Sequence, residues 1–132
     1  MRPLCEASQT HRTLGNVSGH LVNGHTVNIA YHNRHITLDD IKHSEALILE
    51  LAPVGPRYVL AEVPNVRQSS PELRRYPPLP GTVRVALVYA SPVGRMLGNA
   101  YLRLKDSAVE TRLFKDREAA MAWLERQGPP VG

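Results

Sequence analysis

Residues 83–89 are almost all apolar, and only Arg84 interrupts the run. Such a run is typical of a strand that is covered on both faces and lies near the middle of a sheet. The chain then turns at Ser91 and Pro92, which suit the N-cap and the first position of a helix. Apolar residues recur at helical spacing over residues 93–104. The pattern therefore predicts a central strand that leads directly into a helix.

The pair Asn23-Gly24 indicates a β-hairpin between two short apolar segments. Its register follows from the apolar positions, because a slip of one residue turns every side chain to the other face. A three-residue loop pairs Leu21 with Val27 and Val17 with Tyr31, and so places all four side chains on one face. A two-residue loop separates them. We therefore expect the three-residue loop.

Helices and strands alternate along the rest of the chain. Thr37 is suited to cap a helix whose first turn carries Asp39 and Asp40, where the helix dipole favours acidic residues. The remaining segments are a strand at Arg57–Val63, a long irregular loop over residues 64–80, an alternating strand at Val109–Phe114, and a helix capped by Asp116.

This order of elements predicts a single α/β domain. We expect a mixed, mostly parallel sheet of about five strands, with an N-terminal antiparallel hairpin and three to four helices. Residues 83–89 are expected at the centre of the sheet. The predicted boundaries are a flexible N-terminal tail over residues 1–13, the domain over residues 14–127, and a C-terminal tail over residues 128–132.

Composition narrows the classes of function. The chain has 132 residues, of which 42% are hydrophobic, as expected for a soluble domain with one core. No apolar stretch approaches the roughly 20 residues that span a membrane, and one cysteine fits a reducing compartment, so we expect a cytoplasmic protein. The net charge of +4 is spread along the chain, and we expect no nucleic-acid partner.

Sequence motifs give no sign of catalysis. The chain lacks GxSxG, GxxxxGK[ST], HExxH and CxxC, so we expect no catalytic residue and no cofactor. All six histidines lie within residues 11–43. A zinc site needs three or four converging ligands, whereas histidines across a hairpin supply two, so no metal site is predicted.

Two stretches of sequence carry a resemblance to a known family. The C-terminal third is similar to STAS domains, which have the anti-sigma-factor-antagonist fold, and above all to uncharacterised bacterial SpoIIAA-like relatives. The matching residues are Ser91-Pro92-x-x-Arg95-x-x-Gly98-Asn99, Phe114-x-Asp116 and Ala120-x-x-Trp123-Leu124. Tyr58 to Val63, followed by Val66 and Ser69-Ser70, resembles the strand and loop where STAS antagonists hold a phosphorylatable serine.

This resemblance implies a regulatory domain that binds other proteins. It also implies that Ser69 or Ser70 is a phosphoacceptor. The match is incomplete at that point, because STAS antagonists usually have an acidic residue just before the serine and Gly-Leu soon after. Here Gln68 precedes the serines and Pro71-Glu72-Leu73 follows them.

We expect the functional surface at the carboxyl edge of the sheet, where α/β domains usually bind their ligands. The candidate binding residues for a partner or an anion are Ser91, Arg95, Asn99 and Glu62. One hypothesis is a non-enzymatic interaction domain that meets a protein partner or a second copy of itself. The alternative is a small anionic-ligand module, or a small enzyme, that uses the helix N-terminus at Ser91. A pocket lined by Glu62, Ser91 and Arg95 favours the second hypothesis, and a flat apolar patch favours the first.

The sequence predicts no intrinsic hydrolase, transferase or redox activity, because signatures for a nucleophile, a metal and a phosphate loop are missing. Assays with generic ester, phosphoester and redox substrates should give background rates. A turnover that a single substitution at Glu62, Ser91 or Arg95 abolishes would contradict this prediction.

Overall fold

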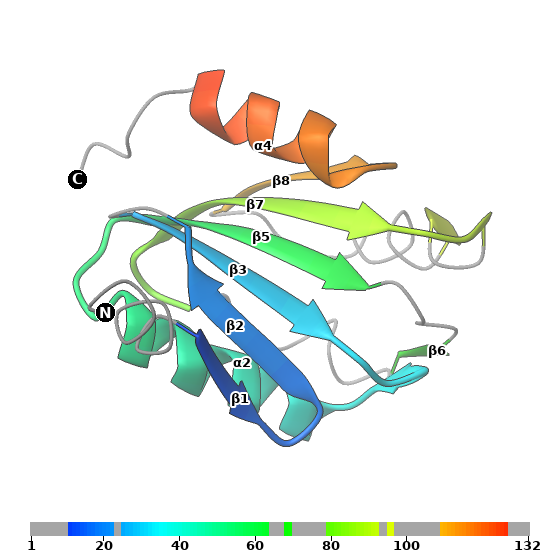
Figure 1. The fold of residues 1–132 in the computed structure, drawn as a ribbon, viewed down its shortest axis with the longest axis horizontal. Coiled ribbons are helices and arrows are strands. Elements are labelled where there is room, and N and C mark those ends of the chain that lie inside the picture. Colours follow the sequence, from blue (N-terminus) through cyan, green and yellow to red (C-terminus); the bar gives the residue numbers. More distant parts are fainter. Residues whose placement is uncertain are drawn as a thin grey trace, which may run out of the picture.

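The computed structural model describes residues 11–22, 25–63, 68–69, 79–92, 95–96 and 109–126. Six strands form one sheet in the order β1-β2-β3-β5-β7-β8, and β4 and β6 form a separate two-stranded sheet (Figure 1). The strands are β1 (His11–Leu14), β2 (Val17–Leu21), β3 (Thr26–Tyr31), β4 (His35–Ile36), β5 (Arg57–Val63), β6 (Gln68–Ser69), β7 (Thr82–Tyr89) and β8 (Glu110–Phe114). The helices are α2 (Leu38–Leu51) and α4 (Arg117–Arg126).

The sheet is mixed, as predicted. Strands β1, β2 and β3 pair antiparallel, and β3, β5, β7 and β8 pair parallel. In the hairpin, Val17 is opposite Tyr31 and Leu21 is opposite Val27, so the register expected from the apolar positions is confirmed. The sheet has one strand more than expected because residues 11–14 form β1. The sequence predicts a tail at residues 11–13, since a short polar strand has no hydrophobic period.

The strand that is covered on both faces is β5, whereas the sequence predicted this burial for residues 83–89 in β7. Six of the seven residues of β5 are buried, whereas only Ala86 and Val88 are buried in β7. The prediction for residues 83–89 is therefore only partly correct. Strand β7 lies inside the sheet with a neighbour on each side, but the middle of the sheet is formed by β3 and β5.

The two described helices begin at the residues that the sequence predicted. Thr37 caps α2, and its side chain and that of Asp40 form a reciprocal capping box. The side chain of Asp116 accepts a hydrogen bond from the backbone N–H of Ala119, 2.8 Å away, at the start of α4. The sequence predicted three to four helices, and the structure describes two. Most of the predicted helix over residues 93–104 lies outside the described residues, where only residues 92, 95 and 96 are seen to be helical.

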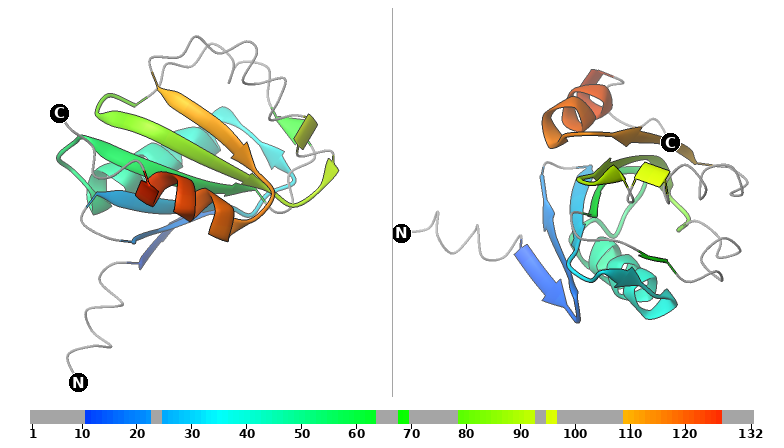
Figure 2. Two further views of the ribbon diagram at one scale, coloured as in Figure 1. Left: turned by 90° about the horizontal axis from the view of Figure 1, so that it is seen from above. Right: turned by 90° about the vertical axis from the view of Figure 1, so that its right-hand side faces the viewer.

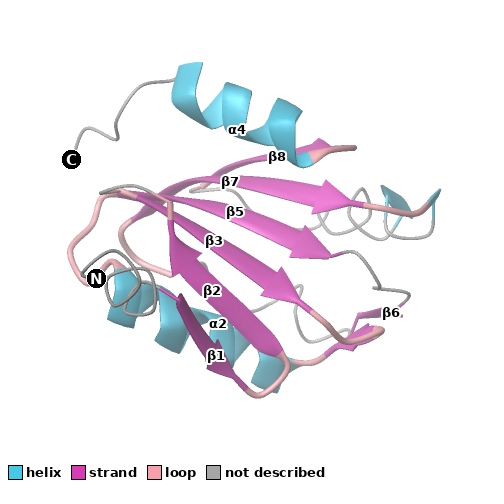
Figure 3. Ribbon diagram, in the orientation of Figure 1, coloured by secondary structure: helices cyan, strands magenta, loops and turns pink. Residues whose placement is uncertain are grey.

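Each helix covers a different half of the sheet on a different face (Figures 2 and 3). Helix α2 packs on β1, β2 and β3, and α4 packs on β5, β7 and β8. Beneath α2, the buried cluster includes Val17, Ile29, Leu47 and Val59. Beneath α4, it contains Tyr58, Leu60, Ala86, Val88, Ala120, Trp123 and Leu124. Within the described part of the chain, no helix is long and apolar enough to cross a membrane.

Burial predicts how two leucines differ in their contribution to stability. Leu60 is fully buried in β5, and Leu87 is only partly buried in β7. Leu60→Ala should lower the free energy of unfolding by about 2–5 kcal/mol, because it removes buried methyl groups and leaves a cavity. Leu87→Ala should cost less. Chemical denaturation of both variants measures the difference, and an equal or larger loss for Leu87→Ala would contradict the burial order.

Candidate functional site

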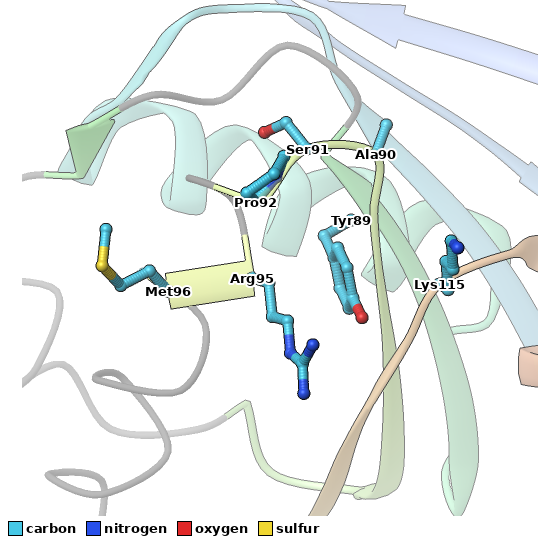
Figure 4. Close-up of a pocket in the computed structure, with 7 residues that line it drawn as sticks. All are labelled: Tyr89, Ala90, Ser91, Pro92, Arg95, Met96 and Lys115. Atoms are coloured by element: carbon cyan, nitrogen blue, oxygen red, sulfur yellow. The ribbon is translucent and has the colours of Figure 1, made fainter.

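An open pocket lies where β7 ends, at the carboxyl edge of the sheet (Figure 4). Its volume is about 420 Å³. The described residues that line it are Tyr89, Ala90, Ser91, Pro92, Arg95, Met96 and Lys115. They come from the end of β7, the turn that follows it, the first turn of the next helix, and the residue that follows β8.

The pairing of two parallel strands forms this pocket. Val88 of β7 is the partner of Phe114 in β8, so the residues that follow them, Tyr89 and Lys115, lie next to each other at the end of these strands. Beyond Tyr89, the Ser91 carbonyl accepts a hydrogen bond of 3.0 Å from the backbone N–H of Arg95, which starts the helical turn. This turn brings Arg95 back over the end of β7.

The charge of the pocket suits an anion. Arg95 and Lys115 are both cationic, and the described lining contains no carboxylate. In the close-up, the Tyr89 ring lies between the Arg95 and Lys115 side chains (Figure 4). The hydroxyl group of Tyr89 adds hydrogen-bonding capacity. The lining can therefore offer two positive charges and a hydroxyl to an acidic group.

Glu62 is not part of this pocket. Successive side chains of a strand point to opposite faces, and Glu62 pairs in register with Val88, whereas Val63 pairs with Tyr89. Glu62 therefore faces α4. Its Oε1 accepts a hydrogen bond of 3.0 Å from Asn28 Nδ2 and lies 3.6 Å from Arg117 Nη1. The sequence grouped Glu62 with Ser91 and Arg95, and the structure separates it from them.

The other predicted site residues are placed only in part. Asn99 and Ser70 lie outside the described residues. The backbone of Ser69 lies in β6, where Ser69 is the partner of Ile36, the residue before the α2 cap (Figure 1). The backbone of Ser69 is therefore next to the start of α2. The role of Ser69 as a phosphoacceptor stays a prediction.

Sequence reasoning missed Lys115. It lies one residue beyond β8, and nothing in its local pattern sets it apart from an exposed lysine next to a helix cap. Its position follows only from the parallel pairing of β7 with β8. Knowledge of the strand order would have been enough to find it, because neighbouring parallel strands end at the same edge.

A polar face lies on the other side of the sheet, next to α4. His11 of β1 and His20 of β2 are directly opposite each other, with ring centroids 6.1 Å apart and planes inclined by 18°. Burial lowers the pKa of His20, Arg117 and His11 lower it further, and Glu62 acts in the opposite direction. Among the described residues, no three His, Cys, Asp or Glu side chains converge as metal ligands.

Comparisons with known proteins identify a family and a fold. Residues 21–127 match the family described as "Domain of unknown function (DUF7793)". The chain is also similar to the crystal structure of an uncharacterised protein of the DUF3478 family from Shewanella loihica PV-4, which has a SpoIIAA-like fold. The TM-score is 0.56 at 14% identity, and the match covers 86% of this chain and 97% of the other. No curated protein matches the chain. The SpoIIAA-like fold predicted from the sequence is confirmed.

The lowered pKa of His20 predicts that stability decreases in mild acid. Below its ordinary pKa of 6.5, His20 takes up a proton in the unfolded chain but not yet in the folded one. The free energy of unfolding should therefore decrease as the pH falls through 6.5 to the lower pKa of the folded state. His20→Gln should flatten this part of the profile. Denaturation of the wild type and of His20→Gln between pH 8 and about 5 measures the difference, and parallel profiles for the two proteins would contradict the prediction.

Proposed function

As a member of the DUF7793 family with a SpoIIAA-like fold, this chain is, we propose, a non-enzymatic regulatory domain that binds another protein or a second copy of itself in the cytoplasm. The pocket at the end of β7 is the proposed docking surface. The observation that carries the proposal is its pair of cations, Arg95 and Lys115, in a pocket whose described lining contains no carboxylate.

Apolar exposure next to these charges supports a protein partner. Met96 is 64% exposed, although it is a large hydrophobic residue, and it lies beside Arg95 in the pocket lining. Methionine side chains adapt to varied partner surfaces, and an exposed apolar group beside cations is a common composition for a docking site. A partner segment with an acidic residue next to an apolar one would satisfy both features.

The pocket lining also supports a binding role over a catalytic one. Its described residues include two hydroxyls but no histidine, cysteine, aspartate or glutamate. A hydroxyl nucleophile needs an adjacent general base to be activated near neutral pH. The described lining thus has positive charges to hold an acidic group, and it contains no histidine or carboxylate beside the hydroxyls to act as their general base.

The alternative function is a module that binds a small anion. The volume of about 420 Å³ supports it, because pockets for small molecules usually measure about 300–1,000 Å³. The two functions differ in the size of the ligand. A small-anion module would bind inorganic phosphate or sulfate without a protein partner, whereas an interaction domain would need the surrounding surface as well.

Charge reversal in the pocket tests the proposal. Arg95→Glu and Lys115→Glu should each reduce capture of the partner from a lysate of the native host by tenfold or more, because each introduces repulsion against an acidic segment. Self-association is measured in parallel by light scattering. Both positions are at the surface, so thermal stability should change little. Lys42→Glu, an exposed charge reversal on α2, is the matched control.

Three results would contradict the proposal. One is capture and self-association that remain unchanged in both pocket variants. Another is an equal loss of capture in Lys42→Glu. The third is binding of phosphate that depends on Arg95 and Lys115 when no protein is captured, and this result would favour the small-anion module.

A further inference from the structure

The histidines of β1 and β2 form a close pair that the sequence does not predict, because strand β1 itself is not predicted from it. In the structure, His11 and His20 are register partners on neighbouring antiparallel strands, and both side chains lie on the face next to α4. Directly opposite residues of such strands have Cβ atoms about 4.5–5.5 Å apart. Two imidazoles are thus held side by side by backbone pairing alone.

We propose that His11 and His20 together form a binding site for a divalent transition-metal ion of the Zn²⁺, Cu²⁺ or Ni²⁺ class. Imidazole nitrogen is a preferred ligand for these ions. A nitrogen binds zinc at about 2.0–2.1 Å, so two rings on one ion have centroids about 5–6 Å apart. The observed separation of 6.1 Å is close to that range. Because the last side-chain torsion of histidine is broad, the stacked rings can turn a nitrogen toward one ion.

The charges around the pair are compatible with a bound cation. Arg117 is the nearby positive charge that opposes a metal ion. Its guanidinium is 3.6 Å from the carboxylate of Glu62, which offsets part of that charge. Zinc sites usually have three or four protein ligands, and no third His, Cys, Asp or Glu converges on this pair in the described part of the chain. The proposed site is therefore an open one with two protein ligands, in which water completes the coordination.

A metal ion at this position would fasten the edge of the sheet. Strand β1 has only four residues and pairs with β2 on one side. The ion pair between Arg12 and Glu50 of α2 attaches β1 to the rest of the fold through side chains. A metal bound by both His11 and His20 adds a link between β1 and β2. Since the unfolded chain does not hold the two imidazoles together, the ion would stabilise the folded state.

Metal titration of the full chain without an affinity tag tests the proposal. All proteins carry Cys5→Ser, because the single cysteine is the strongest competing ligand in the sequence. Calorimetry with Zn²⁺ at pH 7.5 should give one ion per chain, and Zn²⁺ should raise the melting temperature in a way that EDTA reverses. His11→Asn and His20→Asn should each weaken Zn²⁺ binding at least tenfold. His35→Asn, which changes an exposed histidine on β4, should leave binding unchanged.

A second measurement identifies the ligands without relying on the variants. Cu²⁺ is paramagnetic and should broaden the imidazole NMR signals of His11 and His20 before those of the other histidines. The proposal is wrong if Zn²⁺ does not bind, or if either Asn variant binds it within twofold of the parent. It is also wrong if His35→Asn weakens binding as much as His11→Asn. Circular dichroism shows whether each variant keeps the fold. If a variant does not fold, the NMR measurement on the parent protein decides whether the proposal is correct.

Discussion

The burial of β5 on both faces is the constraint on which the rest of the fold depends. Tyr58 and Leu60 point into the cluster beneath α4, and Val59 and Ala61 point into the cluster beneath α2. One strand therefore belongs to both hydrophobic clusters, and its parallel pairing with β3 and β7 fixes where those strands end. The turn at Ser91 and the pocket exist at this edge because β7 is held in that register.

The alternation of side chains along β5 and β7 also divides the polar groups between two faces. Tyr89 packs against the cluster beneath α2 and lines the pocket, whereas Glu62, one register position away, points toward α4. Asn28 donates one hydrogen bond to the Leu60 carbonyl and another to Glu62, so a buried amide holds that carboxylate in place. The pocket and the histidine pair are thus separate sites that a single ligand does not join.

The sequence predicted features that depend on local pattern and missed those that depend on strand order. The register of the β2–β3 hairpin was predictable because only one alignment buries Val17 with Tyr31. The start of α2 was predictable from Thr37 and its acidic first turn. Strand β1 was not, because its residues are mostly exposed and form no apolar period. The positions of Lys115 and Glu62 depend on which strands are neighbours, and one chain's local pattern does not contain that information.

The two edges of the sheet have a consequence for assembly. Strand β1 carries Arg12 beside two exposed residues, His11 and Thr13, and β8 exposes Glu110 and Arg112. Both strands are short, with four and five residues. Short strands with charged side chains resist the edge-to-edge hydrogen bonding by which sheets join into fibres. Edges of this kind favour contacts made through the ends of the strands, where the pocket lies, over contacts made along the strands.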